Sequence, residues 1–137
     1  SAVLDACAEQ GGRILSVHSR GAATPVLDML SAHRSAGTAV LHWFAGTGAE
    51  LTRAIEMGCW FSVGPAMLAG AKGRTLASRM PRNRVLTESD GPFARVSGST
   101  QHPWDVESTL IDLGRLWSLS PVETRQQVRD NLRALVA

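Results

Sequence analysis

Two histidines and one aspartate have residue types and positions that suit metal chemistry. His18, His42 and Asp90 each stand at the end of a short run that contains several aliphatic residues. In a chain where strands and helices alternate, residues just past a strand's carboxyl end point into the ligand-binding face. Imidazole and carboxylate are ligands of zinc, of manganese and of hydrolytic two-metal centres. We therefore predict that the three side chains converge on a metal-dependent hydrolytic site, although an aspartate before Gly91–Pro92 also suits a turn cap.

Four neighbouring residues are candidates for supporting roles at the same site. Glu88 lies two residues before the aspartate, so in a strand both point to one side, and we expect a paired interior carboxylate rather than a ligand. Arg20 suits bidentate binding of phosphate, or it is an exposed surface arginine. Trp43 and Phe44 follow the second histidine in a loop, where they either stack on nucleobases or pack against the rim.

The elements that must position these residues alternate along the chain. Short apolar runs predict strands at 14–17, 38–41, 59–63 and 85–88, with helices between them. Thr24 with Pro25 predicts a capped helix start, and Ser120 with Glu123 predicts a capping box that begins the last helix. Continuous apolar character predicts parallel strands that are covered on both sides.

Four such βα units predict an α/β fold that corresponds to half of a (β/α)8 TIM barrel. A length of 137 residues fits one domain, residues 1–137. The net charge of +2 is too small to indicate nucleic acid by itself. Cys7 and Cys59 match no metal-binding or disulfide spacing, which favours free thiols and a cytoplasmic location, and no run is long enough for a membrane span.

The chain resembles the TatD family of metal-dependent deoxyribonucleases, within the amidohydrolase-like TIM barrels. The similarity covers nearly the whole chain, and its order and spacing are specific together. It is carried by four segments and a C-terminal pair: Val17–Arg20, His42–Thr47, Gly58–Val63, Pro81–Pro92 and Asn131–Leu132. Three details are most similar to the TatD-like member of the Qat anti-phage defence systems: Leu41–Phe44, Met67–Leu68 and Glu88–Phe93.

The resemblance implies a fold, a site and partners. His18, His42 and Asp90 match family metal ligands on the fifth, sixth and eighth strands, with Asp90 also catalytic and the divalent ion being Zn, Mg or Mn. The implied substrate is DNA, single-stranded or at 3′ ends, and defence-system proteins are implied partners. The family's other ligands, a His-x-His pair and a glutamate, have no match here. We therefore expect the C-terminal half of a barrel, inactive alone, which self-associates or needs an N-terminal counterpart.

Two alternatives remain open from the sequence. Related barrels hydrolyse amides, esters and phosphotriesters of small molecules, so the same fold permits another substrate class. A non-catalytic module that binds a partner within a defence complex is the second alternative, and the missing ligands favour it. A comparison of single-stranded DNA with small-molecule esters as substrates distinguishes the first alternative from a nuclease.

Overall fold

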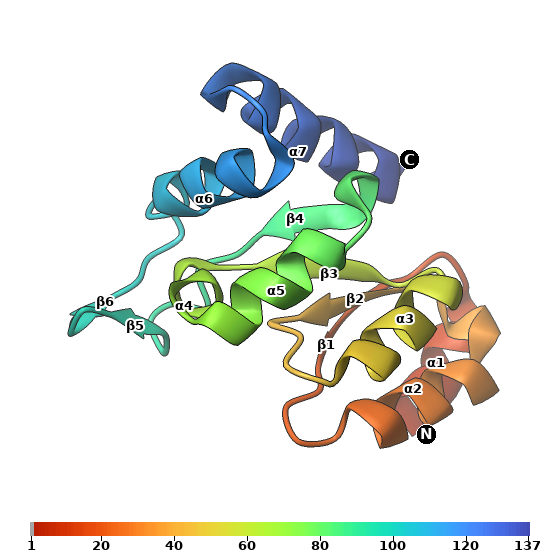
Figure 1. Ribbon diagram of the computed structural model, residues 1–137. Coiled ribbons are helices and arrows are strands. Elements are labelled where there is room, and N and C mark those ends of the chain that lie inside the picture. The colour runs from red at the N-terminus through yellow and green to blue at the C-terminus, as the bar shows by residue number, and fades with distance from the viewer. Residues whose placement is uncertain (1) are drawn as a thin grey trace.

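The computed structural model describes residues 2–137 and has an α/β architecture (Figure 1). The four principal strands are β1 (Ile14–His18), β2 (Thr38–His42), β3 (Trp60–Val63) and β4 (Val85–Thr87). The helices are α1 (Ala2–Gln10), α2 (Ala23–Ala32), α3 (Gly48–Glu56), α4 (Pro65–Ala69), α5 (Ala71–Arg79), α6 (Glu107–Trp117) and α7 (Pro121–Val136). Two 3-10 turns, η1 (Arg34–Ala36) and η2 (Arg82–Arg84), complete the helical segments.

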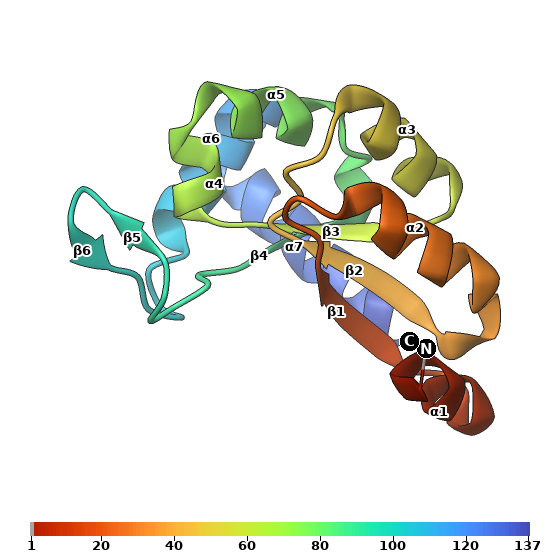
Figure 2. The same cartoon turned by 90° about the horizontal axis from the view of Figure 1, so that it is seen from below.

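The four strands form one parallel sheet, as the sequence predicted, and their order in the sheet is β1-β2-β3-β4. The register pairs His18 with His42, and His42 with Ser62. The carboxyl ends of the strands therefore lie side by side along one end of the sheet. Figures 1 and 2 show α2, α3 and α5 on one face of this sheet, while α6 and α7 extend the helical layer past β4. Within residues 2–137 the sheet does not close, because β1 and β4 are its two edges.

The hydrophobic core lies between the sheet and the helices that cover it. It includes fully buried aliphatic and aromatic side chains from strands and helices alike: Leu27, Leu41, Phe44, Leu51, Phe61, Val63 and Leu113. Each such side chain stabilises the fold by about 1.5–3 kcal/mol relative to an exposed position. Cys59 is also buried in this core, whereas Cys7 on α1 is partly exposed. Neither cysteine forms a disulfide, which agrees with the expected free thiols.

Strand β1 is less covered than the sequence predicted. Its side chains alternate between exposed and half-buried, and Ile14 is 45% exposed. The prediction that all four strands are covered on both sides is therefore wrong for β1. The physical reason is its place at the sheet edge, where β2 is its only strand neighbour within the described residues. An apolar groove of about 480 Å³ runs beside it, lined by side chains of α1, β1 and α2.

Helix caps confirm one prediction and correct another. Ser120 and Glu123 form the predicted capping box of α7, and Thr47 with Glu50 forms a second one at α3. Thr24 is not a cap, because α2 begins at Ala23, two residues before the predicted start at Pro25, and the Thr24 hydroxyl donates to Glu50 Oε1 at 2.7 Å.

The segment after β4 also differs from a plain polar loop. It contains a short antiparallel hairpin of β5 (Arg95–Val96) and β6 (Ser99–Thr100). None of the helices in residues 2–137 has the length and apolar character that a membrane crossing requires.

Helix α7 is fastened to β4 by one buried amide. The Asn131 side-chain nitrogen donates to the carbonyl oxygens of Arg82 at 2.8 Å and Val85 at 2.7 Å. These acceptors lie just before and at the start of β4, the strand that leads into Glu88 and Asp90. The C-terminal helix therefore holds the strand that carries the carboxylates.

Candidate active site

His42 is the centre of the polar cluster at the carboxyl ends of the strands. Its Nδ1 lies 2.5 Å from Glu88 Oε2, and its Nε2 lies 3.2 Å from Asp90 Oδ1. The imidazole ring is therefore held between two carboxylates that come from the segment following β4. With a proton on Nδ1, His42 donates to Glu88 and directs the Nε2 lone pair toward Asp90.

Glu88 is the most buried carboxylate of this cluster. Ser62 donates its hydroxyl hydrogen to the same Oε2 atom that faces His42, while Oε1 is buried without a hydrogen-bond partner among the described residues. Burial raises the pKa of Glu88 above its ordinary value, and the Ser62 hydrogen bond and His42 oppose that rise. This position matches the interior paired carboxylate that the sequence predicted.

His18 and Asp90 complete the set of predicted ligands. The His18 ring lies beside the His42 ring, with 5.4 Å between ring centroids. Asp90 has a φ of 51°, a left-handed conformation that aspartate tolerates better than most residues. The structure thus brings the three predicted side chains together at one edge of the sheet. Among residues 2–137, however, no group of three or more His, Cys, Asp or Glu side chains is close enough to hold a metal ion.

The predicted substrate residues separate into different environments. Arg20 is exposed in the segment after β1, and it makes no salt bridge within the described residues. Trp43 is half-buried at the rim with a φ of 41°. Phe44 is 1% exposed and packs edge-on against Phe61, with ring centroids 6.1 Å apart. Its expected contact with a nucleobase is therefore corrected to a core contact.

Ser62 is a site residue that the sequence reasoning did not single out. It is the only polar side chain in β3, and the parallel register places it opposite His42. A lone hydroxyl in an otherwise apolar strand, one residue before the strand's carboxyl end, was the available signal. The link to Glu88 depends on strand pairing, which no local pattern contains.

The donor set fits a divalent cation at His42 and Asp90. A histidine that ligates a metal usually donates its other ring N–H to a carboxylate, as His42 is placed to do toward Glu88. The distance of 3.2 Å between Nε2 and Asp90 Oδ1 suits two atoms that share one ion, since each metal–ligand bond is about 2.0–2.2 Å. His18 lies next to this pair and offers a further imidazole.

Together, the parallel α/β sheet and the histidine–carboxylate cluster at its carboxyl edge define the class of α/β proteins that bind ligands at strand ends. The family model of the TatD related DNases matches residues 2–137. The chain therefore belongs to the TatD related DNase family.

Individual relatives are similar across most of the chain. Deoxyribonuclease TATDN3 of Homo sapiens is 22% identical over 118 residues, which cover 85% of this chain and 43% of that protein. An uncharacterized metal-dependent hydrolase TatD of Mycobacterium tuberculosis is 28% identical over 131 residues, covering 92% of this chain and 50% of that protein. This chain spans about half the length of the curated relatives it matches.

Solved structures share the fold. A hydrolase TatD family protein from Entamoeba histolytica has a TM-score of 0.78 at 15% identity, covering 89% of this chain and 50% of its own. YJJV, a TatD homolog from Escherichia coli, has a TM-score of 0.76 at 23% identity, covering 89% and 49% of the two chains. Each matched region is about half of the neighbour's chain.

Proposed function

We propose that this chain supplies part of a metal-dependent site that hydrolyses phosphodiester bonds in DNA. One observation carries the proposal: the imidazole of His42 is held between Glu88 and Asp90 at the strand ends of a TatD-family chain. Relatives named as a deoxyribonuclease and a metal-dependent hydrolase support both the substrate and the cofactor. A half barrel, with residues 1–137 as one domain, is the arrangement that the sheet order supports.

Each side chain has a distinct part in this proposal. His42 and Asp90 would hold the divalent cation, Zn, Mg or Mn, and His18 beside the His42 ring would be the third ligand once it moves closer. When bound, the cation would activate water and stabilise charge on the phosphate. Asp90 accepts the proton of the attacking water. Glu88 fixes the orientation of His42 by accepting the Nδ1 proton, and Ser62 fixes Glu88. Arg20 binds a phosphate oxygen, and Trp43 contacts the substrate at the rim.

The biological setting remains part of the proposal. Similarity to the TatD-like member of Qat systems supports a cytoplasmic role in anti-phage defence, with single-stranded DNA or 3′ ends as substrate and defence proteins as partners. A second candidate is a partner-binding module, and the absence of a three-residue metal cluster among the described residues favours it. Restriction of phage growth by cells that express the gene, with and without Asp90, tests the defence role.

Asp90→Asn tests the hydrolytic function directly. The substitution keeps the size of the side chain but removes the charge that a divalent cation requires. In the full-length protein we expect affinity for Zn²⁺ or Mn²⁺ to fall by at least about 10–100-fold, the loss typical when a residue that supports a ligand is replaced, and metal-dependent cleavage of a single-stranded oligonucleotide to be lost. Isothermal titration with each metal and gel analysis of the oligonucleotide measure the two effects.

Asp112→Asn is the matched control, because Asp112 pairs with Arg115 on α6 and does not contact His42. It should leave metal affinity and cleavage unchanged. Cleavage by Asp90→Asn at the unsubstituted rate under saturating metal would contradict the proposal. Tight metal binding without cleavage, in both the unsubstituted full-length protein and the control, would favour the partner-binding module instead.

A further inference from the structure

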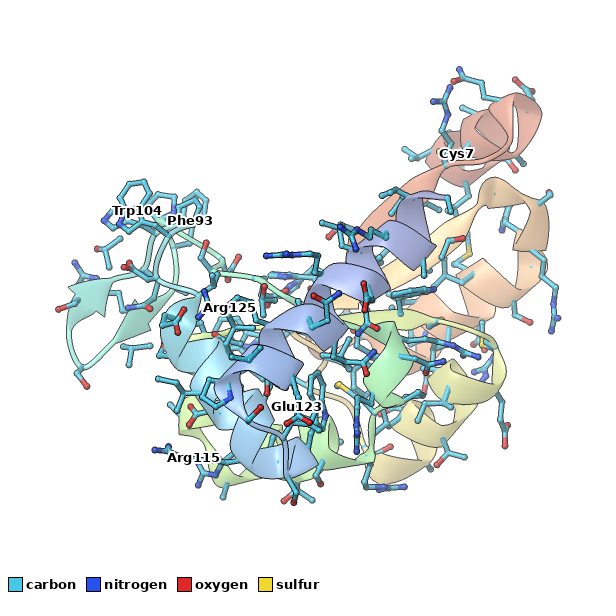
Figure 3. The ribbon with its side chains drawn as sticks, turned by 90° about the horizontal axis from the view of Figure 1, so that it is seen from above. Cys7, Phe93, Trp104, Arg115, Glu123 and Arg125 are labelled. Carbon is cyan, nitrogen blue, oxygen red and sulfur yellow. The ribbon has the colours of Figure 1, made fainter. Side chains whose placement is uncertain are left out.

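Two large aromatic side chains lie almost fully exposed in the segment after Asp90. Phe93 is 87% exposed and Trp104 is 74% exposed, whereas the chain's other aromatic side chains are buried or half-buried. Figure 3 shows Phe93 and Trp104 at the same end of the molecule, the end that carries β5 and β6. Single exposed apolar residues are common, but two large exposed rings at one end of a molecule indicate a binding surface.

Backbone contacts hold Phe93 close to the candidate site. The Phe93 amide donates to the Asp90 carbonyl oxygen at 3.0 Å, and Ala94 donates to the same oxygen at 2.8 Å. A turn of this kind places the two Cα atoms of residues i and i+3 within about 7 Å. Phe93 is therefore fixed one short turn from Asp90, the carboxylate that faces His42.

The backbone near Gly91 and the backbone near Gln101 lie in direct contact. This contact fixes the position of Trp104 relative to Phe93. A Cβ atom on Gly91 would collide with the carbonyl oxygen of Gln101 and would lie 3.3 Å from the Cα of His102. The backbone N–H of Gln101 also donates to the Ala94 carbonyl oxygen at 3.0 Å. Only glycine at position 91 allows these two backbone segments to approach so closely.

His102 supports one side of the Trp104 ring. The two rings are stacked, with centroids 4.7 Å apart and planes 15° apart. The His102 amide donates to Asp105 Oδ2 at 2.8 Å, and the Asp105 amide donates to the His102 carbonyl oxygen at 2.9 Å. The indole is thus already oriented, and little conformational freedom remains to be lost on binding.

One cationic side chain follows Phe93 closely along the chain. Arg95 is exposed on β5, two residues after Phe93, and it makes no salt bridge within residues 2–137. Two exposed rings with an unpaired guanidinium group two residues from one of them have the composition of a surface for single-stranded nucleic acid, where rings stack on bases and cations contact phosphates.

We propose that Phe93 and Trp104 form a stacking platform for unpaired nucleobases of the substrate. The inference rests on the proposed function and specifies its substrate as a single strand, because a base within a duplex has no free face for an aromatic ring. Stacked nucleotides repeat about every 3.4 Å along a strand. The turn from Asp90 therefore places the bound bases about one to three nucleotides from the phosphodiester at that carboxylate.

Binding measurements in the non-cleaving Asp90→Asn chain test the platform. Fluorescence anisotropy of a labelled oligothymidylate is compared with that of an abasic oligomer of equal length, which keeps the phosphates and lacks the bases. We expect Phe93→Ala and Trp104→Ala each to weaken oligothymidylate binding roughly tenfold, and the double substitution to weaken it further. Affinity for the abasic oligomer should not change.

Val122→Ala is the control, since Val122 is a similarly exposed apolar residue on α7, and it should leave both affinities unchanged. Equal oligothymidylate affinity in the double variant would overturn the platform, as would an equal loss with the abasic oligomer or no binding by the Asp90→Asn chain. A change in mass in solution with DNA affinity intact would assign the rings to contact with a second copy instead. Cleavage that depends on Asp90 but not on either ring would overturn the platform and leave the proposed function standing.

Discussion

At the scale of single residues, the side chain of His42 acquires its role from neighbours distant in sequence. Glu88, which contacts His42, is 46 residues from it in the sequence. Ser62, which contacts Glu88, is 26 residues from Glu88 in the sequence. The types and strand-end positions of His18, His42 and Asp90 were visible in the sequence, so their grouping could be predicted. The serine contact could not, because it depends on which strands pair and in which register.

Phe44 shows how a residue's environment differs from what its local sequence suggests. The loop after β2 turns at Trp43, which has a positive φ, and the next side chain points into the core. Neighbouring aromatic residues therefore lie in different environments, one at the rim and one inside. A sequence pattern that only marks the loop as aromatic does not determine which ring is buried.

Truncation of Phe44 should destabilise the fold severely. We expect Phe44→Ala to lower the free energy of unfolding by about 3–5 kcal/mol, because a fully buried ring is removed from its contact with Phe61. The same change at exposed Phe93 should alter it by less than about 0.5 kcal/mol. Urea unfolding followed by circular dichroism measures both, and similar losses at the two positions would contradict the assignment of Phe44 to the core.

At the scale of elements, the strands and most helices could be predicted because their signals are local. Apolar runs identified β1 to β4, and the Ser120–Glu123 pattern identified the start of α7. The start of α2 was predicted wrongly because the Thr24 hydroxyl donates to Glu50 on the next helix. The β5–β6 hairpin was missed because its two-residue strands have no periodicity to detect.

Glu50 should make the stability of α3 sensitive to acid. Hydrogen bonds from the Thr47 backbone amide and then from the Thr24 and Thr47 hydroxyls lower the pKa of Glu50 from 4.5 to about 2. A lowered pKa stabilises the fold above the unfolded value, so this contribution is present above about pH 4.5 and is lost as the pH falls toward 2. Glu50→Gln should therefore show a shallower loss of stability over that range.

Urea midpoints measured at several pH values between 6 and 2.5 give the required slopes. Glutamine still accepts the capping hydrogen bond, so the helix start is retained while the titration is removed. Glu56→Gln changes a glutamate at the other end of the same helix and should keep the original slope. An unchanged slope in Glu50→Gln would show that the Thr47 and Thr24 contacts do not control acid stability.

At the scale of the whole molecule, the sheet ends in two edge strands, and β1 is the more open of the two because the Val85 carbonyl oxygen of β4 already accepts a hydrogen bond from Asn131. The outer sides of β1 and β4 have no strand neighbour within residues 2–137, and the apolar groove beside β1 lies next to one of them. Both edges belong to parallel strands of the same direction, so β4 of one copy is suited to pair with β1 of another. Unpaired edges with apolar side chains favour association.

We therefore expect the purified chain to associate with itself at micromolar concentration. Ile14→Lys should shift it toward the mass of a single chain, because a lysine on an edge strand opposes pairing. Ile111→Lys on α6 is the matched control, since the two isoleucines are 45% and 44% exposed, and it should not change the mass. Light scattering coupled to gel filtration distinguishes these results, and a monomeric unsubstituted chain would contradict the expectation.

Only one of the two cysteines is accessible to a thiol-specific reagent, and it lies at one end of the molecule. Cys7 is partly exposed on α1, and Figure 3 shows it at the opposite end from Phe93 and Trp104. Cys59 is buried, and burial raises the pKa of its thiol, so its reactive thiolate is scarce at neutral pH. A dye or a surface tether attached through maleimide chemistry would therefore go to Cys7, and an immobilised chain would face the solution with its histidine–carboxylate end.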